Sequence, residues 1–257
     1  MNTKKIEEIA VAAVRNEILR NDLLSDEIPV NDKTPSWDGE IWVYNNKNQK
    51  KNDLYGKVPV QVKGKKVSEF SKEGTKFPIK KVDLDNYFTN GGILYFVIEM
   101  IDSDSTQIFY QSLLPIDIKE ILEEMKGGQQ SITKKFKKLP STPKALEYII
   151  RNFIHHSRKQ GIPLISDIKV NDFDVYSTKI IVPSKDNLKE HLFEYDTYMY
   201  GHVENINLDI PLYKIDIDQI IEETDLSIGL EGRIIYNDVA RVIEREKKLW
   251  NLVRVLL

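Results

Sequence analysis

Two short segments near the N-terminus alternate polar and apolar residues as β-strands do, and they constrain the fold more than any other feature. The segments are 36–44 and 58–65. Residues two apart in a strand point to the same face, so Asp38 shares a face with Glu40, and Gln61 shares one with Lys63. If the two strands pair, a carboxylate, an amide and an ammonium group converge at neighbouring strand edges.

The segments around these strands predict a sheet flanked by helices. Residues 5–24 have apolar side chains near helical spacing, which indicates an amphipathic helix. The polar stretch 45–53 suits a hairpin loop, and the almost wholly apolar run 91–100 is typical of a strand buried on both faces. A strand over 108–113 and a helix over 116–125 follow. We predict an α/β (α+β) fold with a mixed sheet.

The second half of the chain has a different character. Residues 129–142 are polar and basic and contain Pro140, which favours a linker between two domains, 1–128 and 143–257. Beyond it we expect a helix over 143–161, a helix-like end over 238–257, and short strands that make the second domain β-rich. The expected strands are 168–170, 177–182, 197–203, 207–213 and 232–236. The apolar end, Leu256–Leu257, predicts docking on this domain or continuation in a longer natural chain.

Composition excludes several classes of function. The chain has no cysteine, which rules out disulfides, thiolate zinc sites and cysteine nucleophiles. A formal charge of -3 gives no global attraction to a polyanion, so a nucleic-acid site needs a local basic patch. No signal core is present, and no apolar run approaches the about 20 residues of a membrane span. We expect a cytoplasmic protein without membrane segments.

The polar groups on the two strands suit phosphodiester hydrolysis. That reaction needs a cation that neutralises developing charge, oxygen ligands that hold it, and a group that orients the attacking water. Asp38 can supply a carboxylate oxygen, Gln61 an amide oxygen and Val62 a backbone carbonyl, all of the hard kind that Mg²⁺ accepts. Lys63 would then hold the water and the phosphate.

These residues resemble the PD-(D/E)XK restriction-endonuclease-like superfamily. A helix with a glutamate, a strand with Asp38 and a strand with Gln61-Val62-Lys63 come in the order of that superfamily's site. The Gln-x-Lys form resembles its Mrr-like and Holliday-junction-resolvase-like members. The wider pattern, including residues 83–87 and 91–97, is similar to N-terminal nuclease domains of bacterial anti-phage defence proteins. The resemblance covers about residues 5–125.

The resemblance implies a role for each matching residue. Asp38, Gln61 and Lys63 are implied to be catalytic, with Mg²⁺ or Mn²⁺ held by Asp38, Gln61 and Val62. Glu8, on the first helix, best fits the helix glutamate that completes the metal site, and Glu7 and Glu17 are alternative registers. Glutamine in place of the second carboxylate should weaken metal binding, so Glu8, or Glu40 as its substitute, becomes more important.

Lysines around the two strands make this part of the chain locally basic. Lys51, Lys57, Lys65 and Lys66 are the candidates for contacts with a nucleic-acid backbone. A solvated lysine-rich loop is the plain alternative. A second cluster, 134–138, has a phenylalanine among four lysines and suits either a phosphate grip or a linker.

We therefore predict a metal-dependent endonuclease that cleaves DNA in anti-phage defence or restriction, with RNA left open as a substrate. It is expected to act as a homo-oligomer or as a subunit of a defence complex. One rival is a degenerate nuclease fold that binds nucleic acid or a partner without cutting. The other is a sensor subunit whose functional part is the C-terminal half.

Overall fold

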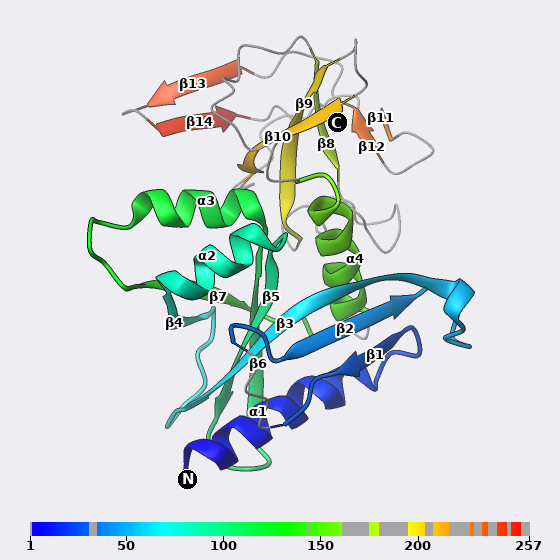
Figure 1. Cartoon of the computed structure of the whole chain (residues 1–257), viewed down its shortest axis with the longest axis vertical. Helices are drawn as coiled ribbons and strands as arrows, with labels where there is room; N and C mark the ends of the chain where they lie inside the picture. The colour runs from blue at the N-terminus through cyan, green and yellow to red at the C-terminus, as the bar shows by residue number, and fades with distance from the viewer. Residues whose placement is uncertain are drawn as a thin grey trace. The chain divides into compact units, whose positions relative to one another are not determined.

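The chain folds into two compact units, residues 1–158 and 159–257. The computed structural model describes residues 2–30, 35–142, 144–160, 175–179, 195–203, 208–215, 227–228, 233–235, 241–245 and 248–252 (Figure 1). The first unit combines a mixed seven-stranded sheet with helices, and the second is built on an antiparallel sheet. The predicted α+β class with a β-rich second part is thus confirmed.

The sheet of the first unit has the order β1-β2-β3-β5-β6-β7-β4. Strands β3 and β5 are parallel, whereas the other neighbouring pairs are antiparallel. The parallel pair is joined through a helix, as parallel neighbours require. The strands are β1 (Leu24–Glu27), β2 (Gly39–Tyr44), β3 (Leu54–Lys66), β4 (Thr75–Lys80), β5 (Ile93–Met100), β6 (Thr106–Leu113) and β7 (Ser131–Lys138). Both ends of this sheet, β1 and β4, are edge strands.

The described part of the first unit contains four α-helices. They are α1 (Thr3–Ile18), α2 (Lys81–Thr89), α3 (Pro115–Glu124) and α4 (Ala145–Ser157), with a short 3₁₀ turn, Lys51–Asp53, in the loop before β3. The side chain of Asn2 caps α1 by accepting from the Lys5 amide at 2.8 Å. Proline begins α3, and Asp117 accepts from the Leu114 amide at 2.9 Å, which fixes its first turn.

The alternation of β3 separates the helices into two layers. A Cβ on Gly64 would lie 2.5 Å from Ile6 of α1, and one on Gly56 would lie 3.1 Å from Ile154 of α4. Both glycines are at even positions, so α1 and α4 cover one face of the strand. Gln61, at an odd position, contacts Tyr87 of α2 from the opposite face. Lys63 and Lys65 point to this second face as well.

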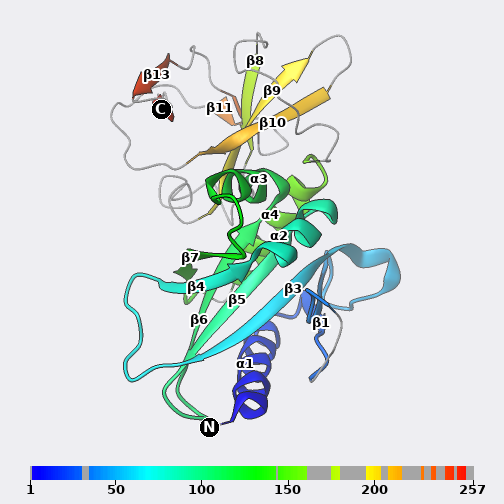
Figure 2. The same cartoon turned by 60° about the vertical axis from the view of Figure 1, so that its left-hand side comes forward.

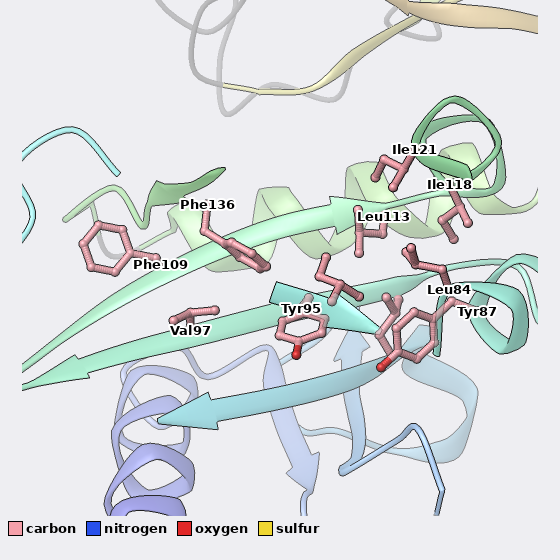
Figure 3. Close-up of a cluster of buried hydrophobic side chains, with 11 residues drawn as sticks. Leu84, Tyr87, Tyr95, Val97, Phe109, Leu113, Ile118, Ile121 and Phe136 are labelled. Atoms are coloured by element: carbon pink, nitrogen blue, oxygen red, sulfur yellow. The ribbon is translucent and has the colours of Figure 1, made fainter. Parts of the chain in front are cut away.

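The core on the second face fills the space between the sheet and α2 and α3. It contains Tyr87, Tyr95, Phe109 and Phe136, each buried, with aliphatic side chains from α3 and β4 around them (Figure 3). The rings of Tyr95 and Phe136 lie 5.2 Å apart in an edge arrangement. Strand β5 is buried along all eight residues, which confirms the prediction for the apolar run 91–100.

The segment predicted as a linker, 129–142, contains a strand of the sheet. Strand β7 pairs with β6 at one end and with β4 along its length (Figure 2). Helix α4 belongs to the first unit too, so the chain divides after Arg158 and not at 129–142. The polar composition suggested a linker because four of the eight residues of β7 are lysines and only Phe136 of this strand is buried.

Two further expectations differ from the structure. The first helix, expected to reach residue 24, ends at Ile18, and residues 24–27 form the edge strand β1. Within the segment 238–257, expected to be helix-like, the described residues form an antiparallel pair, β13 (Arg241–Arg245) and β14 (Lys248–Leu252). In β13 and β14, residues with a preference for strands, Val242, Ile243 and Trp250, favour this pairing.

The second unit is built on a sheet of order β10-β9-β8-β12-β11. Its strands are β8 (Val175–Lys179), β9 (Thr197–Val203), β10 (Leu208–Ile215), β11 (Ser227–Ile228) and β12 (Arg233–Ile235). Four of the five predicted strands overlap these segments, whereas 168–170 lies outside the described residues. In β9, Tyr198 and Tyr200 are buried, which gives this sheet an aromatic core of its own.

Candidate active site

Asp38, Gln61 and Lys63 meet where β2 begins. The Oδ2 atom of Asp38 accepts a hydrogen bond from the Val62 amide at 2.7 Å and one from the Gln61 side-chain amide. The Lys63 ammonium lies 3.5 Å from the same oxygen. This ion pair is long, and the Lys63 side chain is 43% exposed, so the ammonium is free to move toward a bound group.

The pairing of β2 with β3 produces this convergence. Gly39 is opposite Val60, and the Asp38 amide donates to the Val60 carbonyl at 2.9 Å. Gly39 has a φ of 144°, and a Cβ there would lie 2.1 Å from the Glu27 carbonyl oxygen. Glycine therefore lets the chain enter β2 directly against the end of β1, and the preceding aspartate is left at the strand terminus.

Asp38 keeps one oxygen available for a ligand. Its Oδ1 atom has no hydrogen-bond donor among the residues that the structure describes. The amide and the carbonyl of one strand residue point to the same neighbour, so the Val62 carbonyl projects to the side where its amide meets Asp38. A carboxylate oxygen and a backbone carbonyl thus face the same edge.

Gln61 is present at the site in an orientation that sequence reasoning did not foresee. Its amide nitrogen points to Asp38, and its Oε1 atom accepts from the Tyr87 hydroxyl at 3.0 Å. The side chain is buried, and both ends of the amide have partners. For the oxygen to become a ligand, the amide must rotate by about half a turn, after which its NH₂ group could donate to the hydroxyl of Tyr87.

Burial controls the protonation of the tyrosines beside the site. Burial raises the pKa of Tyr87 far above its usual range, and the neighbouring Tyr95, Asp83 and Asp38 raise it further. Burial, then Asp83 and Asp38, likewise raise the pKa of Tyr95. Both hydroxyls point to the same side of the cluster in Figure 3. Tyr87 therefore remains a neutral hydroxyl that can donate to Gln61 or accept from it.

Helix α2 also holds the segment that leads into Asp38. Ser36 donates to Asp83 at 2.7 Å and accepts from Asn86 at 2.9 Å, and Trp37 packs edge-on against Tyr87. Ser36 has a φ of 68°, a conformation that these two hydrogen bonds help to maintain. Tyr87 and Asp83 were missed as site residues, although their i, i+4 spacing on a predicted helix signals a shared face.

Glu8 lies on the other side of the sheet from this cluster. It is on α1, which packs against the even positions of β3, whereas Gln61 and Lys63 point away from α1. Its carboxylate is 3.9 Å from Lys4 Nζ, and 45% of the side chain is exposed. The alternative Glu17 pairs with Arg20 at 2.9 Å. The structure does not bring the helix glutamate to Asp38.

Glu40 shares a strand face with the site but is held elsewhere. Both of its oxygens accept from Lys57 Nζ, at 2.7 and 2.8 Å. Lys57 also lies 5.8 Å from the centre of the Trp42 ring. The predicted substitute ligand and the predicted DNA-binding lysine therefore neutralise each other.

The remaining predicted lysines have different surroundings. Lys65 donates to Thr75 Oγ1 at 2.9 Å and lies 3.5 Å from the buried Glu99, so it connects β3 to β4 and β5. Lys66 and Lys51 are exposed. Neither has an ion pair within the described part of the chain, and both remain open to an anionic ligand.

The donor set suits a hard divalent cation bound with few protein ligands. Asp38 Oδ1, the Val62 carbonyl and, after rotation, Gln61 Oε1 are the oxygen atoms that could hold Mg²⁺ or Mn²⁺. Mg²⁺ commonly keeps several waters and takes only one or two carboxylates. The described residues contain no group of three or more His, Asp or Glu side chains placed to bind a metal ion. The site therefore differs from a carboxylate-rich metal centre.

The first unit is an α+β fold with a polar cluster at the end of a β-hairpin. Comparison with known proteins assigns it to no family. The sequence matches no protein-family profile and no curated protein, and the structure matches no solved structure. The described helices are each too short or too polar to cross a lipid bilayer.

Proposed function

We propose that the first unit is a metal-dependent phosphodiesterase that hydrolyses DNA, with Asp38, Gln61 and Lys63 as its site. The observation that carries the proposal is the convergence of these three side chains at one strand end. Apart from the additional strands β1 and β4, the order of elements supports it: a helix, a strand that follows Asp38, a strand with Gln-x-Lys, a helix and a buried strand. That is the order expected from the resemblance to PD-(D/E)XK nucleases.

Each residue has a physical role in the proposed reaction. Asp38 offers Oδ1 to the cation while its Oδ2 is fixed by the Val62 amide. Bound Mg²⁺ would neutralise charge on the phosphate and acidify a water. Lys63, loosely held at 3.5 Å from Asp38, can move to the phosphate or to the attacking water and stabilise developing charge. Tyr87 positions Gln61 through a hydroxyl that stays protonated.

A second candidate function is a nuclease fold that binds nucleic acid without cleaving it. The separation of Glu8 from Asp38 favours it, as does the use of the Gln61 oxygen by Tyr87. Loss of a carboxylate lowers the affinity of a site for Mg²⁺. A role in anti-phage defence or restriction and assembly into an oligomer come from the resemblance alone.

A cleavage assay separates the two candidates. Plasmid, linear duplex and single-stranded DNA, together with RNA, are incubated with Mg²⁺ or Mn²⁺ and the wild-type chain, Asp38→Asn, Lys63→Ala or Glu8→Gln. We expect wild type and Glu8→Gln to cut DNA, and the other two variants to lose about 100-fold or more in rate. Binding of DNA by wild type without cleavage under either metal would support the non-catalytic candidate.

A further inference from the structure

Strands β4 and β7 form an antiparallel ribbon whose two faces differ sharply. The inward face carries Thr75, Ile79 and Phe136, which are buried. The outward face carries exposed lysines, which we call the β4–β7 lysine face. Its members are Lys76, Lys80, Lys135 and Lys137.

Two of these lysines lie directly opposite each other. The register pairs Lys76 of β4 with Lys135 of β7. Like charges at opposed positions of an antiparallel pair repel each other and destabilise the ribbon. Within the described residues, no carboxylate lies within ion-pair distance of Lys76, Lys80 or Lys135. The fold thus concentrates positive charge that an external anion can neutralise.

The neighbouring lysine and acidic residues leave this charge in place. Lys134, on the inward side of β7, pairs with Glu124 of α3 at 2.7 Å. Glu73, exposed before β4, and Asp83, which accepts a hydrogen bond from Ser36, are each three residues in sequence from the face. The net charge of -3 for the whole chain therefore conceals a strongly basic local surface.

Strand β4, which carries part of the lysine face on its outward side, lies beside the strand of the candidate site, and Lys65 reaches its inward side. Lys65, two residues after Lys63 on the same face of β3, donates to Thr75 and lies 3.5 Å from the Lys76 carbonyl oxygen. Residues two apart on a strand are about 7 Å apart. One chain of neighbouring residues thus leads from Lys63 through Lys65 to Lys76 and, across the ribbon, to Lys135.

We propose that the β4–β7 lysine face binds the phosphate backbone of the nucleic acid that enters the candidate site. The choice of partner rests on the proposed function, because a polyphosphate is the one anion that would span both the site and the face. A lipid surface fits less well. The exposed large apolar side chains among the described residues are Leu19, Val30, Leu54, Val82 and Ile101, and none is on β4 or β7. Peripheral membrane binding usually adds such anchors to its basic residues.

The test is the salt dependence of DNA binding by the full chain, followed by fluorescence anisotropy in EDTA so that no cleavage occurs. Lys76→Ala/Lys135→Ala is compared with wild type and with Lys5→Ala/Lys47→Ala, which removes the same charge from exposed positions elsewhere. Each lost phosphate contact lowers the slope of log K against log salt by about 0.9. We expect the affinity drop between about 50 and 200 mM salt to become about tenfold smaller for the first variant alone.

Three results would overturn the inference. They are an unchanged slope of log K against log salt in Lys76→Ala/Lys135→Ala, an equal change of slope in the control variant, and no DNA binding by wild type. If Lys76→Ala/Lys135→Ala weakens binding to phosphatidylserine vesicles but not to DNA, the face binds membranes instead. Melting temperatures check folding, and removal of repulsion should leave them equal or higher. If DNA binding requires the lysine face but wild type does not cleave DNA in Mg²⁺, the nuclease proposal is wrong and this inference still holds.

Discussion

At the scale of single residues, the hydrogen bond from Tyr87 to Gln61 determines what the candidate site can do. Gln61 can ligate a cation only if its oxygen leaves Tyr87, and the hydroxyl can then accept from the rotated amide. The tyrosine can thus hydrogen-bond to either orientation of the glutamine amide. A carboxylate at this position could not exchange partners in that way, because an ionised carboxylate accepts hydrogen bonds only.

Replacing Tyr87 by phenylalanine removes the partner of a buried amide oxygen. We predict that Tyr87→Phe lowers the free energy of unfolding by about 1–3 kcal/mol and slows cleavage, because Gln61 is left unsatisfied and unoriented. Tyr95→Phe is the matched control, since Tyr95 lies in the same cluster and has no hydrogen bond to Gln61. Urea denaturation and cleavage rates measure both effects. Equal behaviour of the two variants would remove Tyr87 from the site.

Glu99 gives the fold a pH dependence that is independent of catalysis. Burial alone would raise its pKa, but hydrogen bonds from Ser71 and Thr75 and the charge of Lys65 outweigh burial, so the pKa of Glu99 is lowered. A carboxyl with a lowered folded-state pKa stabilises the fold above its unfolded pKa, near 4.3, and loses that contribution as pH falls through the folded value.

The corresponding variant is Glu99→Gln. We predict that it is less stable than wild type by on the order of 2 kcal/mol near neutral pH, and that the difference shrinks below about pH 4 as wild-type Glu99 becomes protonated. Unfolding free energies at a series of pH values measure this. A difference that stays constant down to the acid limit would contradict the assigned role of Glu99.

At the scale of elements, the approach of α1 to β3 depends on the glycine that follows Lys63. A Cβ on Gly64 would lie 2.5 Å from Ile6 Cγ2 and 2.8 Å from the Ile6 carbonyl oxygen. The backbone oxygen cannot move without the helix, so a methyl group here must push α1 off the strand that bears the site. The glycine in Gln61-Val62-Lys63-Gly64 thus has a packing role and no chemical one.

We therefore predict that Gly64→Ala lowers the free energy of unfolding by about 1–3 kcal/mol through overpacking. Gly127→Ala is a suitable control, because a Cβ there meets no atom within 4 Å. Thermal denaturation of both variants checks the prediction. Unchanged stability of Gly64→Ala would mean that α1 does not pack as closely as described.

Elements with a clear period could be predicted from the sequence, and those that depend on partners could not. Alternation predicted that Gln61 and Lys63 share one strand face, and the hairpin loop over 45–53 indicated that β2 pairs with β3, which brings Asp38 to them. The wrong placement of Glu8 has another origin: a helix pattern shows which face is apolar, but not which side of the sheet that face will cover. Strand β7 was missed because its lysines give the segment a polar composition, although Phe136 within it is buried.

At the scale of the whole molecule, the first unit needs residues beyond the predicted boundary. Strand β7 closes the core with Phe136 and, among the described strands, is the one that pairs with β4. Helix α4 covers β3 near Gly56, and Arg151 of this helix bonds to the Tyr44 carbonyl at 2.7 Å. A fragment that ends before these elements exposes to water the parts of the sheet that β7 and α4 cover.

We predict that a fragment of residues 1–158 unfolds in one cooperative transition, whereas a fragment of residues 1–128 does not fold or aggregates, because β4 is left unpaired and the core open. Circular dichroism and size-exclusion chromatography of the two fragments measure this. Cooperative folding of 1–128 would place the boundary where composition had suggested.

Binding of Mn²⁺, followed by electron paramagnetic resonance, tests most directly whether Asp38 anchors a divalent cation beside Lys63. We predict that wild type and Glu8→Gln bind Mn²⁺ equally well, since Glu8 is on the far side of the sheet. Asp38→Asn should bind it about tenfold more weakly or not at all. Equal binding by wild type and Asp38→Asn, or no binding by wild type, would contradict the proposed site.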